Sequence, residues 1–176
     1  MKKSFAVLSP FVAALLVASS ANALTYTITS SLDGAQETPP VITLGTGTMT
    51  GTYDDVTNIL TWSGTFSALT GTTTDAHFHG PAAPGVGPAG VLVHITAAGG
   101  GDIFPLGVTS GAFSGTATLS ALNETRLLSG LIYINIHSTF RPGGEIRGQV
   151  FATLVPEPAP LALLGLGLVA LALRRR

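Results

Sequence analysis

The sequence of 176 residues contains no cysteine, and only 10% of its residues are charged. Without cysteine the chain forms no disulfide, has no thiolate ligand for a metal and no thiol nucleophile. Both lysines, Lys2 and Lys3, stand at the N-terminus, so residues 24–154 contain three arginines, eight acidic residues and no lysine. Because binding nucleic acid requires a basic surface, we expect no nucleic-acid partner.

The apolar residues are concentrated at the two ends of the chain, which explains a mean hydropathy as high as +0.49. Residues 1–23 have the order of a secretory signal peptide: Lys2 and Lys3, an apolar run, then the small residues Ala21 and Ala23 two positions apart. We expect signal peptidase to cleave there, so that the mature chain starts near Leu24. An uncleaved anchor is the alternative, but the apolar run is shorter than the ~20 residues of a membrane-spanning helix.

Residues 155–176 form a second segment that is typical of exported proteins. An apolar stretch without charge, 161–173, would make a helix of about 20 Å, a minimal membrane span. Arginines after such a span stay in the cytoplasm, which leaves the rest of the chain on the far side of the membrane. The motif before the stretch and the tail after it are Pro156, Glu157, Pro158, Arg174, Arg175 and Arg176.

This ending resembles the PEP-CTERM sorting signal, in which a Pro-Glu-Pro motif, an apolar helix and a basic tail follow one another. The resemblance implies a Gram-negative bacterium that makes extracellular polysaccharide, a transient inner-membrane anchor and removal of the tail by an exosortase. A permanent single-span transmembrane anchor is the alternative.

The middle of the chain, residues 24–154, is long enough for one domain and is rich in residues of strands and turns. Threonine occupies 23 of its 131 positions and glycine 20. Alternating apolar and polar residues predict eight strands at 24–32, 44–53, 59–66, 74–79, 91–95, 111–119, 131–137 and 145–153. Residues 120–128 predict one short helix, with Ser120 as its N-cap. We therefore expect an all-β domain, an antiparallel Greek-key sandwich or barrel.

Polar side chains share one face of several predicted strands. Residues two apart in a strand point to the same side, so His77 and His79 lie together. If 138–144 connects the last two strands, His137 lies opposite Glu145. The same hairpin register places Asn135 opposite Arg147 and Tyr133 opposite Gln149.

These positions predict a candidate metal site. If the strand of His77 and His79 lies beside the last hairpin, three imidazoles and the Glu145 carboxylate converge, a ligand set that suits zinc or copper but has too few oxygens for calcium. In that site Glu145 is the fourth ligand or orients a histidine. The alternative is an ordinary hydrated face with a hydrogen-bonded network. We expect His94 to be a separate, half-buried histidine.

Three segments resemble the signatures of the CHRD domain: 32–40 (LDGAQETPP), 76–81 (AHFHGP) and 131–137 with 142–149 (LIYINIH and PGGEIRGQ). The resemblance implies an all-β extracellular module with no established catalytic activity. His77, His79, His137, Glu145 and Arg147 fall on its motif positions, whereas His94 does not. Phe78 replaces the commoner aliphatic residue between two histidines.

Two functions are compatible with this sequence. The first is a non-enzymatic protein of the cell surface or the exopolysaccharide matrix, and the second is an extracytoplasmic zinc- or copper-binding protein. A third, more distant, is an enzyme similar to Cu/Zn superoxide dismutases, which share a His-x-His and a distal histidine. The sequence lacks their disulfide cysteines and a bridging histidine followed by a zinc loop, and it has no nucleophile elbow or phosphate loop. We therefore expect no enzyme.

Overall fold

The computed structural model describes residues 23–95, 103–156, 171 and 173–174 of the chain. These residues form nine strands, one α-helix and one short 3₁₀ helix. The strands are β1 (Thr25–Asp33), β2 (Thr46–Asp54), β3 (Ile59–Ser67), β4 (Thr73–His79), β5 (Val91–His94), β6 (Gly111–Thr118), β7 (Tyr133–Ser138), β8 (Ile146–Gln149) and β9 (Phe151–Leu154). The helices are η1 (Gly34–Gln36) and α1 (Ala121–Leu128).

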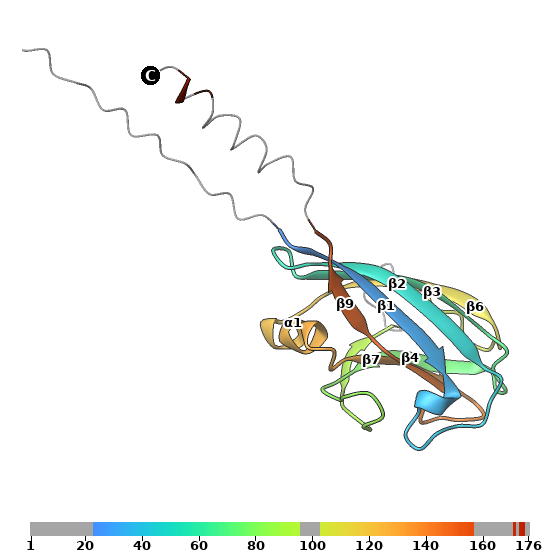
Figure 1. The fold of residues 1–176 in the computed structure, drawn as a ribbon. Coiled ribbons are helices and arrows are strands. Elements are labelled where there is room, and N and C mark those ends of the chain that lie inside the picture. The colour runs from blue at the N-terminus through green and yellow to red at the C-terminus, as the bar shows by residue number, and fades with distance from the viewer. Residues whose placement is uncertain (1–22, 96–102, 157–170, 172, 175–176) are drawn as a thin grey trace, which may run out of the picture.

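The strands form a nearly closed antiparallel barrel. Their order is β5-β4-β7-β8-β1-β2-β3-β6, and β9 pairs with β1 beside this path. Figure 1 shows the two layers of the barrel, with β1, β2, β3 and β6 in one and β4 and β7 in the other. The predicted all-β antiparallel fold with one short helix is confirmed.

The hydrophobic core lies between the two layers. The alternation that predicted the strands holds in three dimensions, because every second side chain of β1, β2 and β3 is buried. Trp62 of β3 packs edge to face on Phe78 of β4, with ring centroids 5.0 Å apart, and so joins the layers. Since Phe78 points into the core, its neighbours His77 and His79 point to the outer side of their layer.

Helix α1 begins as the sequence predicts. The Ser120 side chain accepts a hydrogen bond from the backbone N–H of Asn123, the arrangement of an N-cap. Leu127 is fully buried and fixes the helix against the core. A substitution of the cap serine by alanine typically costs about 1 kcal/mol of stability.

The last predicted strand, 145–153, is in fact two strands. The chain passes from one layer to the other at Val150, which is fully buried and donates its N–H to the carbonyl of Ile132. Before this residue β8 lies between β7 and β1 and pairs with both, and after it β9 continues along β1. A continuous apolar and polar alternation does not indicate which neighbour a strand pairs with, so the sequence missed the break.

Both ends of the domain leave from the same side of the barrel. The N–H of Val155 donates to the carbonyl of Thr25 at 2.9 Å, so β1 begins where β9 ends (Figure 1). The predicted signal peptide and the predicted C-terminal transmembrane helix lie almost wholly outside the described residues. Among the residues that are described, no helix is long and apolar enough to cross a membrane.

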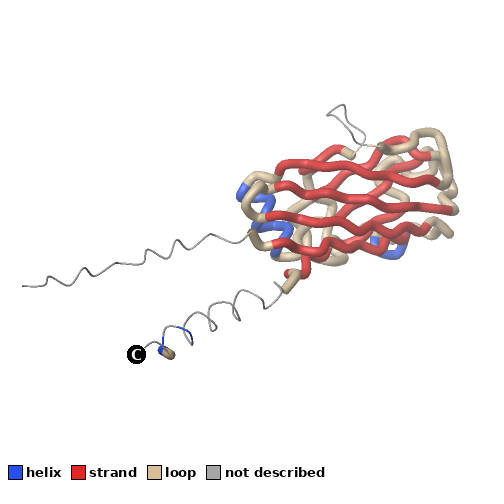
Figure 2. Tube along the Cα trace, turned by 90° about the horizontal axis from the view of Figure 1, so that it is seen from above, coloured by secondary structure: helices blue, strands red, loops and turns tan. Residues whose placement is uncertain are grey.

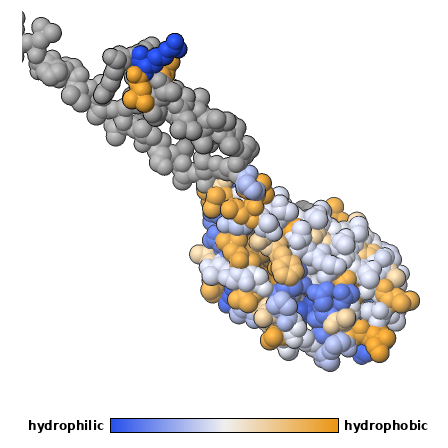
Figure 3. All heavy atoms as spheres, viewed as in Figure 1, coloured by the Kyte–Doolittle hydropathy of each residue, from blue (hydrophilic) through white to orange (hydrophobic). Residues whose placement is uncertain are grey.

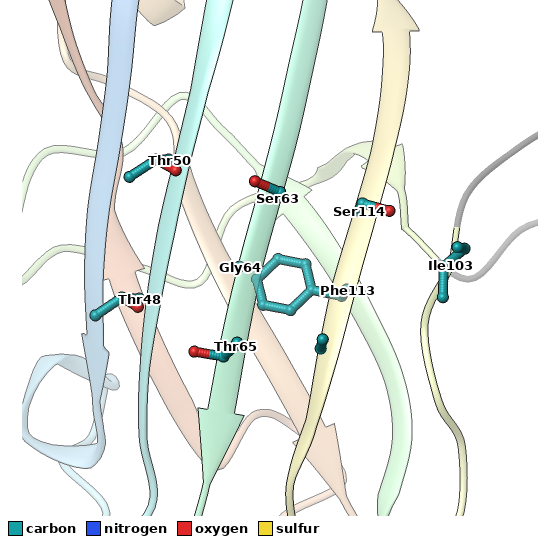
Figure 4. A pocket seen from close by; sticks show the side chains of 9 residues that line it. Thr48, Thr50, Ser63, Gly64, Thr65, Ile103, Phe113 and Ser114 are labelled. Atoms are coloured by element: carbon teal, nitrogen blue, oxygen red, sulfur yellow. The ribbon is translucent and has the colours of Figure 1, made fainter.

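The outer face of β2, β3 and β6 is covered by small hydroxyl side chains. Figure 2 shows these strands side by side, and weakly polar residues cover much of the surface in Figure 3. A shallow hollow on this face is lined by Thr48, Thr50, Ser63, Thr65 and Ser114, among others (Figure 4). None of its lining residues is ionisable, so the hollow offers no acid, base or metal ligand.

Candidate metal centre

Polar side chains follow the paired strands β5, β4, β7 and β8 across the outer side of their layer. One row runs from His94 through His77 and Asn135 to Arg147, each residue paired with the next. Two further pairs, His79 with Tyr133 and Asp75 with His137, flank this row. The predicted pairings of Asn135 with Arg147 and of Tyr133 with Gln149 are present in the structure.

Three imidazoles from two strands meet on this face. His77 Nδ1 lies 3.1 Å from His137 Nε2, and one ring nitrogen each of His77, His79 and His137 lies within 4.8 Å of the others. A metal ion bonds imidazole nitrogen at ~2.0 to 2.1 Å, so three nitrogens converge on one ion after side-chain adjustments of about 1 Å. The structure thus brings together all three histidines that the sequence singled out.

In each ring, the nitrogen that points away from the other two rings faces a backbone carbonyl or a carboxylate. His79 Nδ1 donates to the carbonyl of Ala89 at 2.9 Å, and His137 Nδ1 donates to the carbonyl of Pro142 at 2.7 Å. His77 Nε2 lies 3.0 Å from Asp75 Oδ2.

These contacts decide which nitrogens carry hydrogen. A carbonyl oxygen only accepts, so His79 and His137 carry their hydrogen on Nδ1 and direct the Nε2 lone pair inward. His79 Nε2 is buried and has no hydrogen-bond partner. Outer N–H groups held by carbonyls and Nε2 lone pairs directed inward, as in His79 and His137, are the arrangement of metal-ligating histidines. His77 Nδ1 forms a hydrogen bond with His137 Nε2, so without an ion it is Nδ1 of His77 that carries the proton, which must leave this nitrogen when an ion binds there.

Burial favours the neutral forms of His77 and His79. It lowers the pKa of His77 to about 4, with the neighbouring histidines acting in the same direction and Asp75 against them. Burial also lowers the pKa of His79, although its bond to the Ala89 carbonyl opposes the shift. Only the neutral ring offers a lone pair to a metal, so burial holds His77 and His79 in the form that can bind one.

Aromatic and cationic groups fix the edge of the site. The ring of His79 stacks on that of Tyr133 with centroids 5.0 Å apart and an angle of 7° between the planes. The Arg147 guanidinium lies over the Tyr133 ring at 3.5 Å and donates to the Val86 carbonyl at 2.8 Å. Arg147 is 1% exposed, so it holds the 81–90 loop onto the sheet.

Glu145 does not join the imidazoles, and this corrects the prediction that it is a fourth ligand or orients a ligand. Its buried carboxylate accepts hydrogen bonds from the hydroxyls of Thr43 and Ser138 and from the N–H groups of Thr70 and Gly71. Burial raises its pKa, but these hydrogen bonds outweigh burial and the net shift is downward. The residue lies in the turn before β8, where the strand register no longer fixes the direction of the side chain.

Glu37 is buried beside this network but does not reach the imidazoles. It is 7% exposed, and burial raises its pKa to about 7 against the attraction of Arg147 and a hydrogen bond from Asn135.

His94 is not a separate half-buried histidine, which corrects the prediction for it. It is exposed, its ring centroid lies 4.6 Å from that of His77, and it forms a second cluster with His77 and Asp75. The two predicted strands 74–79 and 91–95 contained the signal, because a hairpin that joins them through a loop at 81–90 places His94 opposite His77.

Two family models match the chain. The C-terminal model, described as the PEP-CTERM protein-sorting motif, matches residues 154–176. This motif implies export across the inner membrane to the cell envelope or surface and processing by an exosortase. No curated protein and no solved structure matches the chain. The second model, described as the CHRD domain, matches residues 28–150 and so spans the barrel and all four histidines. The chain therefore belongs to the CHRD domain family.

Proposed function

We propose that this exported CHRD-domain protein is a non-enzymatic metal-binding protein, which holds one zinc or copper ion through His77, His79 and His137. The observation that carries the proposal is the orientation of the rings. Their outer nitrogens are engaged by two carbonyls and a carboxylate, and their inner nitrogens converge. A hydrated polar face has no need for this arrangement in three separate side chains.

The ligand chemistry favours zinc or copper over harder ions. Three neutral imidazoles suit zinc and copper, whereas calcium and magnesium require oxygen ligands. Three protein ligands leave a fourth position on a tetrahedral ion. A water molecule or a group from a partner would fill it.

The location of the proposed ion is outside the cytoplasm. A signal peptidase would remove residues 1–23, and the chain would pass through a transient inner-membrane anchor before an exosortase acts on its tail. We propose the cell surface or the exopolysaccharide matrix as its destination, since the sorting motif is the observation that favours this role. In the matrix, the bound ion would be stored, or would join the protein to anionic or nitrogen-containing groups of other components.

Metal titration of the purified full chain tests the binding. Treatment with a chelator, then zinc or copper at 100 times the dissociation constant, should raise the free energy of unfolding by about 2.7 kcal/mol and the thermal midpoint on the order of 10 °C. His79→Ala and His137→Ala should abolish this shift, whereas His94→Ala should retain it. A chain that retains no ion by elemental analysis and shows no shift with either metal contradicts the proposal.

A further inference from the structure

The two histidine clusters on the outer face share one side chain. His77 belongs both to the cluster with His79 and His137 and to the cluster with Asp75 and His94. Its two ring nitrogens serve different sides: Nδ1 lies 3.1 Å from His137 Nε2, and Nε2 lies 3.0 Å from Asp75 Oδ2. The His77 ring thus stands between two groups of possible ligands.

We infer that His77 bridges two metal ions, the second of which is bound by Asp75, His77 Nε2 and His94. This inference rests on the proposed function for the first ion. In the second cluster one ligand atom of each residue lies within 4.8 Å of the others. Nitrogen and carboxylate oxygen are ligands that zinc and copper both accept, at about 2.0 to 2.2 Å for zinc.

The position of His94 is what distinguishes a second ion from a simple contact between Asp75 and His77. A carboxylate alone would suffice to orient the His77 ring. The strand pairing places a further imidazole directly opposite His77, with the ring centroids 4.6 Å apart and the planes at 84°. His94 is exposed and Asp75 is half-buried, so an ion reaches this side from solvent while the other side lies deeper.

Charge and protons balance in the bridged state. A neutral His77 carries one ring proton, and binding an ion at each nitrogen releases that proton to solvent. The resulting imidazolate carries one negative charge and Asp75 a second, which partly offset the charge of two divalent ions. Binding the second ion therefore releases one proton from His77 in addition to any proton that the other ligands lose.

The number of ions bound by the purified full chain tests this inference separately from the proposed function. We expect two zinc ions per wild-type chain by elemental analysis, and one for His94→Ala and for Asp75→Asn. His94 is exposed at the end of an edge strand, and Asp75→Asn is a conservative change, so both variants should keep the wild-type circular dichroism spectrum. A single ion in the wild type, unchanged in both variants, overturns the bridge and leaves the proposed function standing. No ion in the wild type overturns both.

Copper(II) provides the second readout, because two unpaired spins joined through one imidazolate couple to each other. The electron paramagnetic resonance signal per copper should be weaker in the wild type loaded with two equivalents than in His94→Ala loaded with one. Two bound copper ions with the full uncoupled signal would mean two separate sites and would overturn the bridge. Loss of the coupling in Asp75→Asn would support it.

Discussion

Glu37 is a buried carboxyl whose pKa lies well above its ordinary range. Burial raises it from 4.5 to about 7, even though the Arg147 guanidinium favours the ionised form. In the folded chain the carboxyl therefore keeps its proton at pH values where the unfolded chain has lost it. A raised pKa contributes stability that is complete below pH 4.5 and is lost as the pH rises through 7.

This shift predicts how the variant Glu37→Gln responds to pH. Since glutamine does not titrate, the free energy of unfolding of the wild type relative to the variant should fall by about 2.5 kcal/mol between pH 5 and pH 8. Urea denaturation of both proteins across this range measures the difference. If the free energies of unfolding of the two proteins change in parallel across this pH range, the pKa of Glu37 is not raised.

We predict that replacing Glu145 by glutamine lowers the stability of the fold without releasing the metal. It accepts hydrogen bonds from two hydroxyls and two backbone N–H groups, so Glu145→Gln turns one acceptor into a donor facing donors. We expect about 2 kcal/mol less stability by urea denaturation and unchanged ion binding. The matched control, Glu124→Gln on the first turn of α1, should change stability by well under half of that. Loss of the ion in Glu145→Gln would restore Glu145 as a ligand.

At the scale of the elements, a glycine permits β8 to lie close against β1. A Cβ atom at Gly148 would overlap Ser30 Oγ and the carbonyl of Ser31, whereas a Cβ at Gly90 would meet no heavy atom within 4 Å. Overpacking of this kind typically costs about 1 to 3 kcal/mol. Gly148→Ala should therefore unfold at clearly lower urea concentration than the wild type, and Gly90→Ala near the wild-type midpoint. Equal midpoints for the two variants would contradict this close approach.

Local signals sufficed for the strands apart from the break between β8 and β9, and also for the helix and the last hairpin. A loop at 138–144 fixed the partners of Asn135 and Tyr133 through simple counting, and Ser120 marked the start of α1. The pairing of β4 with β7 was different, because more than 50 residues separate them and no local signal selects that neighbour. The sequence therefore predicted that His77 and His79 meet His137 only on the condition that their strand lies beside the last hairpin.

Two side chains near the candidate site were predicted wrongly, for different reasons. Glu145 precedes β8, and its direction depends on N–H groups at Thr70 and Gly71 that are far away in the chain. His94 lies opposite His77 by the same counting that gives the last hairpin, with 81–90 as the loop between their strands. The sequence therefore predicted the three convergent imidazoles and missed the second cluster.

At the scale of the whole molecule, the barrel separates its hydrophobic core from its polar chemistry. Phe78 and the isoleucines of β7 fill the interior, while the histidines of the same strands lie on the outer side, with His79 against the 81–90 loop. Both ends of the domain leave from one side, so the predicted signal peptide and sorting tail would extend from a single end of the barrel. Export and removal of these segments would then leave the histidine face intact.

X-ray absorption at the zinc edge, on full chain loaded with one equivalent of zinc, tests the central claim most directly. The account predicts nitrogen neighbours at about 2.0 to 2.1 Å, with the outer scattering of three imidazole rings. His79→Ala, loaded at the same ratio, should lose one ring from this pattern. A wild-type spectrum of oxygen neighbours alone, without imidazole scattering, would contradict the claim that His77, His79 and His137 share an ion.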